Sequence, residues 1–165
     1  MTPPRDRGLL ALMDLHALER FVVAAKRATY VGNGERAEPS RIGSHDLTFA
    51  DGSWLYRDSY FGGSDFLGQE VVWQAGTPVW VMSYYGYITR PDLIDGQRAG
   101  ATIKAALGAL YREGRFLGGF EWAGPHGVYR DSSTGGVEHF KGRETIEVAG
   151  VEAYALDYFG GLVKP

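Results

Sequence analysis

A length of 165 residues suits a single domain with one hydrophobic core, and the 24 glycines and 22 aromatic residues indicate strands joined by many tight turns. A net charge of −3, with 17 lysines and arginines scattered along the chain, argues against nucleic acid as the main partner, because phosphate neutralisation requires a clustered basic surface. The absence of cysteine excludes disulfides, thiol nucleophiles, cysteine-ligated zinc and iron–sulfur clusters, and it is compatible with a reducing cytoplasm.

The beginning of the chain contains one apolar run, Leu9 to Met13, which is too short for a signal-peptide core or a membrane span. We therefore expect no membrane association and a cytoplasmic location. Two prolines and mixed charges predict that residues 1–13 form a flexible segment, and we assign residues 14–165 to a single domain.

The first predicted element is a helix that is capped by Asp14 and runs to about Arg27. An apolar stripe on this helix is expected to pack on the core: Leu15, Leu18, Val22 and Ala25. Three charged residues are expected to face water: Glu19, Arg20 and Lys26. The following segment, residues 29–43, is rich in glycine and charged residues and is predicted to be a loop.

Four aromatic-rich runs separated by glycine turns then predict four consecutive strands, at residues 45–50, 53–61, 66–74 and 78–88. The Asp51-Gly52 pair is a strong signal for a two-residue hairpin. Short connections of this kind join neighbouring antiparallel strands, so the segment is predicted to form a meander.

A second helix is predicted from about Gln97 to Glu113, with Asp92 as its cap and Gly114 as its left-handed end. Two glycines inside this helix, Gly100 and Gly108, each reduce helix stability by about 1 kcal/mol relative to alanine. Close contact with the sheet would explain both of them.

Five further strands are predicted near residues 115–122, 128–131, 137–140, 144–148 and 152–159. The fold class is therefore α+β, with a curved, mostly antiparallel sheet built from meanders and packed against two main helices. One partial echo matches Tyr56 and Tyr60–Gly63 to Tyr154 and Tyr158–Gly161 in spacing. Five matched positions are too few to predict a duplication, and we interpret them as similar strand ends.

Complete catalytic signatures are missing from the sequence. Neither the nucleophile elbow Gly-x-Ser-x-Gly nor a phosphate-binding glycine loop occurs. The four histidines do not have the spacing of a metal site: His16, His45, His126 and His139. We therefore predict no metal and no cofactor.

Two acidic residues nevertheless lie among apolar neighbours on adjoining strands, namely Asp58 and Glu70. If they were close together and partly desolvated, one of them could hold a raised pKa and act as a general acid or base. His45, which precedes Asp46 at the start of its strand, is a third candidate for proton transfer. The alternative interpretation is that each acid pairs with an arginine or faces solvent.

The aromatic side chains suggest a ligand pocket on the sheet, since tyrosine and tryptophan combine a broad apolar surface with a polar tip. Candidate ligand-binding residues are Arg27, Tyr56, Trp80, Tyr84 and Arg130. Packing in the core is the alternative role for these aromatic residues. The predicted function is small-molecule binding, of sensor or effector type. An enzyme of hydrolase or isomerase type and a protein-interaction module remain as alternatives, and a homo-oligomer stays open.

Several ordered motifs connect the sequence to a family. They include Ala24–Tyr30, Gly32-Asn33-Gly34, Gly43–Leu47, Tyr60–Gly63 and Tyr84-Tyr85-Gly86. With these motifs the chain resembles, over Leu15 to Gly161, a bacterial domain-of-unknown-function family that occurs alone or as the C-terminal part of Xre-type helix-turn-helix regulators. The resemblance implies a sensing or effector-binding module and supplies no catalytic residues. About fourteen residues precede the first helix, so we expect no helix-turn-helix there and no direct DNA binding.

Overall fold

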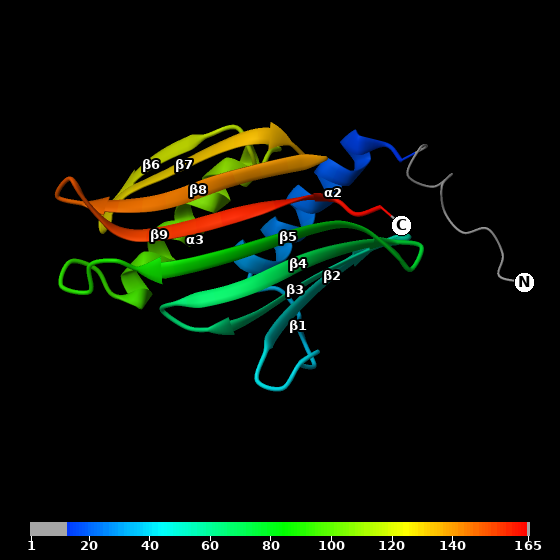
Figure 1. Cartoon of the computed structure of the whole chain (residues 1–165), viewed down its shortest axis with the longest axis horizontal. Helices are drawn as coiled ribbons and strands as arrows, with labels where there is room; N and C mark the ends of the chain where they lie inside the picture. The colour runs from blue at the N-terminus through cyan, green and yellow to red at the C-terminus, as the bar shows by residue number, and fades with distance from the viewer. Residues whose placement is uncertain (1–12, 165) are drawn as a thin grey trace, which may run out of the picture.

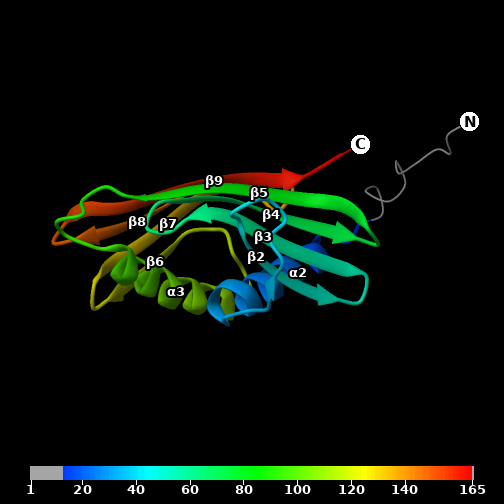
Figure 2. The same cartoon turned by 90° about the horizontal axis from the view of Figure 1, so that it is seen from below.

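Two helices cover one face of a nine-strand antiparallel sheet in the computed structural model, which describes residues 13–164 (Figures 1 and 2). The expected α+β class, with a curved sheet packed against two main helices, is confirmed. The flexible segment predicted over residues 1–13 lies, apart from Met13, outside the described residues. None of the helices in the described part of the chain is long and apolar enough to cross a membrane.

Helix α2 (Leu15–Lys26) begins where the sequence predicts, because the Asp14 carboxylate accepts hydrogen bonds from the backbone N–H groups of His16 and Ala17. The chain then continues into a π-helical turn, η1 (Arg27–Val31), instead of entering a loop directly. A two-residue edge strand, β1 (Arg36–Ala37), interrupts the remainder of the predicted loop and pairs with the next strand.

The first meander consists of β2 (His45–Asp51), β3 (Trp54–Gly62), β4 (Phe66–Gln74) and β5 (Thr77–Ile88). Its strand positions agree with the prediction to within about one residue. Helix α3 (Gly96–Arg112) follows. Its cap is Asp95, whose side chain accepts a hydrogen bond from the Arg98 N–H, so the choice of Asp92 was wrong. Asp92 forms an ion pair with Arg90 instead.

The second meander consists of β6 (Phe120–Gly124), β7 (Gly127–Gly136), β8 (His139–Val148) and β9 (Val151–Leu162). Five strands were predicted here and four exist, because the two runs at 137–140 and 144–148 belong mainly to the single strand β8. Gly142 suggested a turn between them. It lies in mid-strand instead, where the ring of Tyr158 covers it.

The sheet order is β1-β2-β3-β4-β5-β9-β8-β7-β6, so the two meanders meet where β5 pairs with β9. Each half of the domain is a helix followed by four antiparallel strands, α2 with β2–β5 and α3 with β6–β9. Matched strands lie at equal distances from the β5–β9 junction. The two halves are therefore related by an approximate two-fold arrangement.

Equivalent positions in the two halves carry the same residue types. Asp58 on β3 is opposite Glu70 on β4, and Asp131 on β7 is opposite Glu144 on β8. In each half a glycine lies two residues before the glutamate and a tyrosine fourteen residues after it: Gly68 and Tyr84, and Gly142 and Tyr158. This repeat differs from the partial echo in the sequence, which matched β3 to β9.

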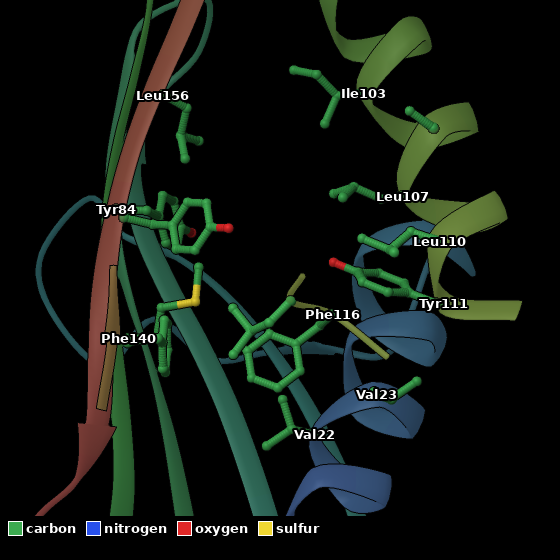
Figure 3. Close-up of a cluster of buried hydrophobic side chains, with 14 of the residues drawn as sticks. Val22, Val23, Tyr84, Ile103, Leu107, Leu110, Tyr111, Phe116, Phe140 and Leu156 are labelled. Atoms are coloured by element: carbon green, nitrogen blue, oxygen red, sulfur yellow. The ribbon is translucent and has the colours of Figure 1, made fainter. Parts of the chain in front are cut away.

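The core lies between the inner face of the sheet and the two helices, and its side chains meet across the space between these layers (Figure 3). Tyr56 is 1% exposed and Trp80 is 0% exposed. The indole N–H of Trp80 donates a hydrogen bond to the carbonyl oxygen of Val137, 3.0 Å away. This bond connects β5 to the β7–β8 turn and thereby ties the two halves together.

Candidate functional site

A cavity of about 200 Å³ lies between the inner face of the sheet and helix α3. Figure 3 shows part of its walls, with Tyr84 and Leu156 on the sheet facing Ile103 and Leu107 on the helix. Most of the lining is apolar or aromatic, but one amine and three carboxyl side chains also reach it: Lys26, Asp58, Glu70 and Glu144. The cavity draws these groups from both halves of the domain.

Glu70 is held by an ion pair. The Lys26 Nζ atom is 2.7 Å from Oε1 and 2.6 Å from Oε2 of Glu70, and both residues are buried. The same ammonium is 3.6 Å from the Met82 sulfur and 5.5 Å from the centroid of the Phe116 ring. Because an aromatic face attracts a cation, the Phe116 ring helps to fix the position of the Lys26 ammonium beside the cavity.

Asp58 is bound differently, although it lies directly opposite Glu70 in the sheet. Its Oδ1 atom accepts a hydrogen bond of 2.7 Å from the Tyr84 hydroxyl. Burial, and then the neighbouring Glu70, raise the pKa of Asp58 to about 7. Asp58 is therefore a carboxyl that changes its charge near neutral pH.

The pKa of Glu144 is also raised. Burial, and then the nearby Asp131, raise its pKa to about 8. Its Oε2 atom has no hydrogen-bond partner among residues 13–164, and none of the ion pairs in this part of the chain includes it. A carboxyl in such surroundings keeps its proton at neutral pH because its ionised form is poorly solvated.

Phenol groups complete the polar lining. Burial is the largest cause that raises the pKa of Tyr111 and Tyr154, and the charge of Glu144 adds to the shift in both cases. These tyrosines therefore remain protonated and can donate hydrogen bonds into the cavity. In the described residues no group of three or more histidine, aspartate or glutamate side chains has the geometry of a metal site.

A family model for a domain of unknown function, DUF5680, matches residues 58–163. The chain belongs to the DUF5680 family. Searches of curated proteins and of solved structures gave no significant match. The DUF5680 segment begins at Asp58 and includes Glu70, Tyr84 and Glu144, whereas Lys26 and α2 precede it.

Three of the residues predicted to carry chemistry or bind a ligand are brought together in the cavity of this DUF5680 protein: Asp58, Glu70 and Tyr84. The interpretation that the acids pair with arginine or face solvent does not hold for them, because Glu70 pairs with a lysine and Asp58 with a tyrosine.

The other candidates lie elsewhere. Tyr56 and Trp80 are in the core and do not line the cavity. Arg27 is exposed, and Arg130 is exposed in ion pairs with Glu121 and Glu147. His45 is exposed at the start of β2, where its ring lies 5.2 Å from that of Tyr60. The cavity therefore has no histidine among its lining residues.

Two important residues were not among the sequence candidates. Lys26 was expected to face water, but it is only 4% exposed because the helix end is covered by the sheet. Glu144 was not proposed at all. The signal that could have found it is the repeated Gly-x-Glu in Gly68–Glu70 and Gly142–Glu144, each followed fourteen residues later by a tyrosine.

Proposed function

We propose that the domain binds a small molecule in the cavity between the sheet and α3. The observation that carries this proposal is the combination of an apolar cavity with buried ionisable groups, Lys26, Asp58, Glu70 and Glu144, that converge on it. Apolar walls provide binding energy, and a few fixed polar groups select and orient a ligand.

The size of the cavity limits the ligand. A volume of about 200 Å³ is below the ~300–1,000 Å³ that is usual for pockets of drug-sized ligands. A compound with a small ring or a short chain fits this space. The family resemblance adds a role for such binding, that of a sensing or effector-binding module, and we propose the cytoplasm as its compartment.

Helix glycine Gly100 offers a direct test. It lines the cavity, and a Cβ atom added there would have no heavy atom within 4 Å. Gly100→Phe should therefore place a ring in the cavity and compete with a ligand. The control is Ala105→Phe, which adds a similar side chain to an exposed position of the same helix.

The experiment is a thermal-shift screen of the full chain against a library of small metabolites. A ligand at 100 times its Kd stabilises the folded state by about 2.7 kcal/mol. We expect hits that stabilise the parent protein and Ala105→Phe but not Gly100→Phe. If no hit is lost in Gly100→Phe, binding in this cavity is refuted.

A second candidate is an enzyme that uses acid–base chemistry in the same cavity. The observation that favours it is Asp58, whose pKa is raised to about 7 by burial and by Glu70, because a general acid or base works best near the ambient pH. Incubating each hit with the protein and analysing it by mass spectrometry and NMR tests for turnover. Loss of any conversion in Asp58→Asn would support catalysis.

A role in protein interaction is favoured by a different surface. Leu67, Tyr85 and Phe159 are 55%, 46% and 63% exposed. Each follows a residue whose side chain lies on the helix side of the sheet, namely Phe66, Tyr84 and Tyr158, so all three point to the opposite face. Leu67 is directly opposite Tyr85, and Phe159 lies on the adjoining strand β9. Exposed apolar groups of this kind suit a partner chain. Replacing Tyr85 and Phe159 by serine should leave ligand binding unchanged and remove such an interaction.

A further inference from the structure

Glu70 and Glu144 occupy equivalent positions in the two halves of the sheet, but only one of them has a cation. Each glutamate is opposite an aspartate, follows a glycine by two residues and precedes a tyrosine by fourteen. On Glu70 the Lys26 ammonium lies within 2.7 Å of both carboxylate oxygens. On Glu144 no lysine, arginine or histidine of residues 13–164 forms an ion pair.

The charges around the cavity favour a cation as the missing partner. Its lining contains three carboxyl groups, on Asp58, Glu70 and Glu144, and one ammonium, on Lys26. Because that ammonium is already held by Glu70, an anionic ligand would find no free positive charge among the described lining residues and would meet two further acids. A positively charged ligand would supply the charge that the buried carboxyls lack.

The apolar side chains of the cavity indicate what type of cation would bind. Helix α3 presents Ile103 and Leu107, and Leu156 faces them from the sheet (Figure 3). An apolar body of a few carbon atoms would fill this part of the cavity. Since the acidic residues of the described chain do not form a metal-binding group, the cation is expected to be organic rather than a metal ion.

We propose that the cavity binds a small organic amine, whose ammonium group pairs with Glu144 as Lys26 pairs with Glu70 and whose apolar body lies against α3. This proposal rests on the proposed function and specifies the chemical class of its ligand. The amine would donate its N–H groups to the Glu144 carboxylate, which lines the cavity and takes part in no ion pair of the described residues.

The pairing also predicts a change in protonation. Burial and Asp131 hold the pKa of Glu144 at about 8, so this carboxyl is mostly protonated at pH 7 in the empty cavity. A bound ammonium favours the ionised carboxylate, and the proton then leaves to solvent. Titratable or charged groups near Glu144 come from the elements around it: Lys26, Tyr30, Glu70, Tyr111, Tyr129, Asp131, Tyr154 and Tyr158.

The test compares three compounds of similar shape: benzylamine, benzyl alcohol and benzoate. Thermal shift and calorimetric titration of the full chain at pH 7 should show binding of benzylamine at least tenfold tighter than that of the alcohol, and none of benzoate. Titration in two buffers with different ionisation enthalpies should show that benzylamine binding releases a proton.

Glu144→Gln should reduce benzylamine affinity at least tenfold and abolish proton release. Its matched control is Glu138→Gln, an exposed glutamate that forms none of the described ion pairs. If Glu144→Gln fails to fold, the comparison of the three compounds and the proton release in the parent protein still decide the matter.

Two kinds of failure can be distinguished. Equal or tighter binding of benzyl alcohol or benzoate overturns the amine assignment. The assignment is also overturned if no amine binds while library compounds of another class bind to the parent protein and fail to bind to Gly100→Phe. In both cases the proposed function stands. If no compound of any class responds to Gly100→Phe, the cavity is not a ligand site and both proposals fail.

Discussion

Tyr84 and Tyr158 lie directly opposite each other on β5 and β9, and the hydroxyl of each donates a hydrogen bond to an aspartate two strands away in its own half of the sheet. Tyr84 reaches Asp58 and Tyr158 reaches Asp131, both at 2.7 Å. Each ring passes over a glycine on the intervening strand. The junction between the two halves is thus lined by a matched pair of tyrosine–aspartate bonds.

The glycines beneath these rings, Gly68 and Gly142, should not tolerate a side chain. A Cβ atom at Gly68 would lie 2.6 Å from the Tyr84 Cζ atom, and one at Gly142 would lie 2.7 Å from the Tyr158 Cε1 atom. We expect Gly68→Ala and Gly142→Ala to lower the free energy of unfolding by about 1–3 kcal/mol each, as overpacking does. Urea denaturation followed by circular dichroism measures this change.

Gly136→Ala is the matched control for these variants, because it also lies in a strand and a Cβ atom there would meet nothing within 4 Å. A loss of stability at Gly136 as large as that at Gly68 would show that the tyrosine rings are not the cause.

Removal of one partner of the buried Lys26–Glu70 ion pair should destabilise the folded state. Lys26→Met retains the aliphatic length of the side chain but leaves the buried Glu70 carboxylate without its cation. We expect the free energy of unfolding to fall by about 3–5 kcal/mol at neutral pH, the usual consequence of breaking a buried pair. Chemical denaturation at pH 7.5 measures the difference.

The double variant Lys26→Met/Glu70→Gln provides the control, since it removes both charges and should recover much of the lost stability. A double variant as unstable as Lys26→Met alone would contradict the electrostatic explanation and assign the effect to packing around Phe116 and Met82.

Stability should decrease as the pH rises from about 5 to 8. Burial and Glu70 raise the pKa of Asp58 to about 7, and burial and Asp131 raise that of Glu144 to about 8. From about pH 5, above the ordinary carboxyl pKa of ~4, up to these raised values, the folded state holds protons that the unfolded state has already lost. Each group therefore lowers the free energy of unfolding by up to about 1.4 kcal/mol per pH unit as the pH rises. This decrease stops once the pH exceeds the pKa of that group in the folded state.

Urea denaturation at intervals from pH 5 to pH 8.5 tests this dependence. Asp58→Asn and Glu144→Gln should each flatten the curve, because an amide does not titrate. The explanation is wrong if stability increases between pH 5 and pH 7, or if the slope is the same in both variants as in the parent protein.

The two glycines of helix α3 should respond differently to replacement by alanine. A Cβ atom at Gly100 would meet nothing within 4 Å, so Gly100→Ala should increase stability by up to about 1 kcal/mol through its higher helix propensity. At Gly108 a Cβ atom would lie 3.2 Å from the Val31 Cγ1 atom, and this contact should offset the gain. Thermal unfolding of the two variants under identical conditions compares them directly, and equal stabilisation would contradict the structure.

Turn chemistry made hairpins in both meanders predictable. Gly52 has a positive φ, as do both residues of the Ala75-Gly76 and Ala149-Gly150 turns, and strands end where such residues occur. Gly142 misled the prediction because a strand glycine required by a neighbouring ring has the same appearance in sequence as a turn glycine.

Long-range pairing limited what could be said of the site. Asp58 and Glu70 are twelve residues apart on adjoining strands and were found together, whereas Glu144 reaches the same cavity only because β5 pairs with β9. No local periodicity encodes that pairing. The role of Gly100 was not predictable from local sequence either. This glycine was expected to touch the sheet, and it lines the cavity instead.

The position of β9 has a consequence for synthesis of the protein. β9 follows all other strands in sequence, yet it occupies the centre of the sheet between β5 and β8. Until Val151–Leu162 has left the ribosome, the twelve-residue β5 and the ten-residue β8 each present an unpaired edge. Open edges of this length pair readily with other chains. Nascent chains halted before Val151 are therefore expected to aggregate more readily than the complete chain.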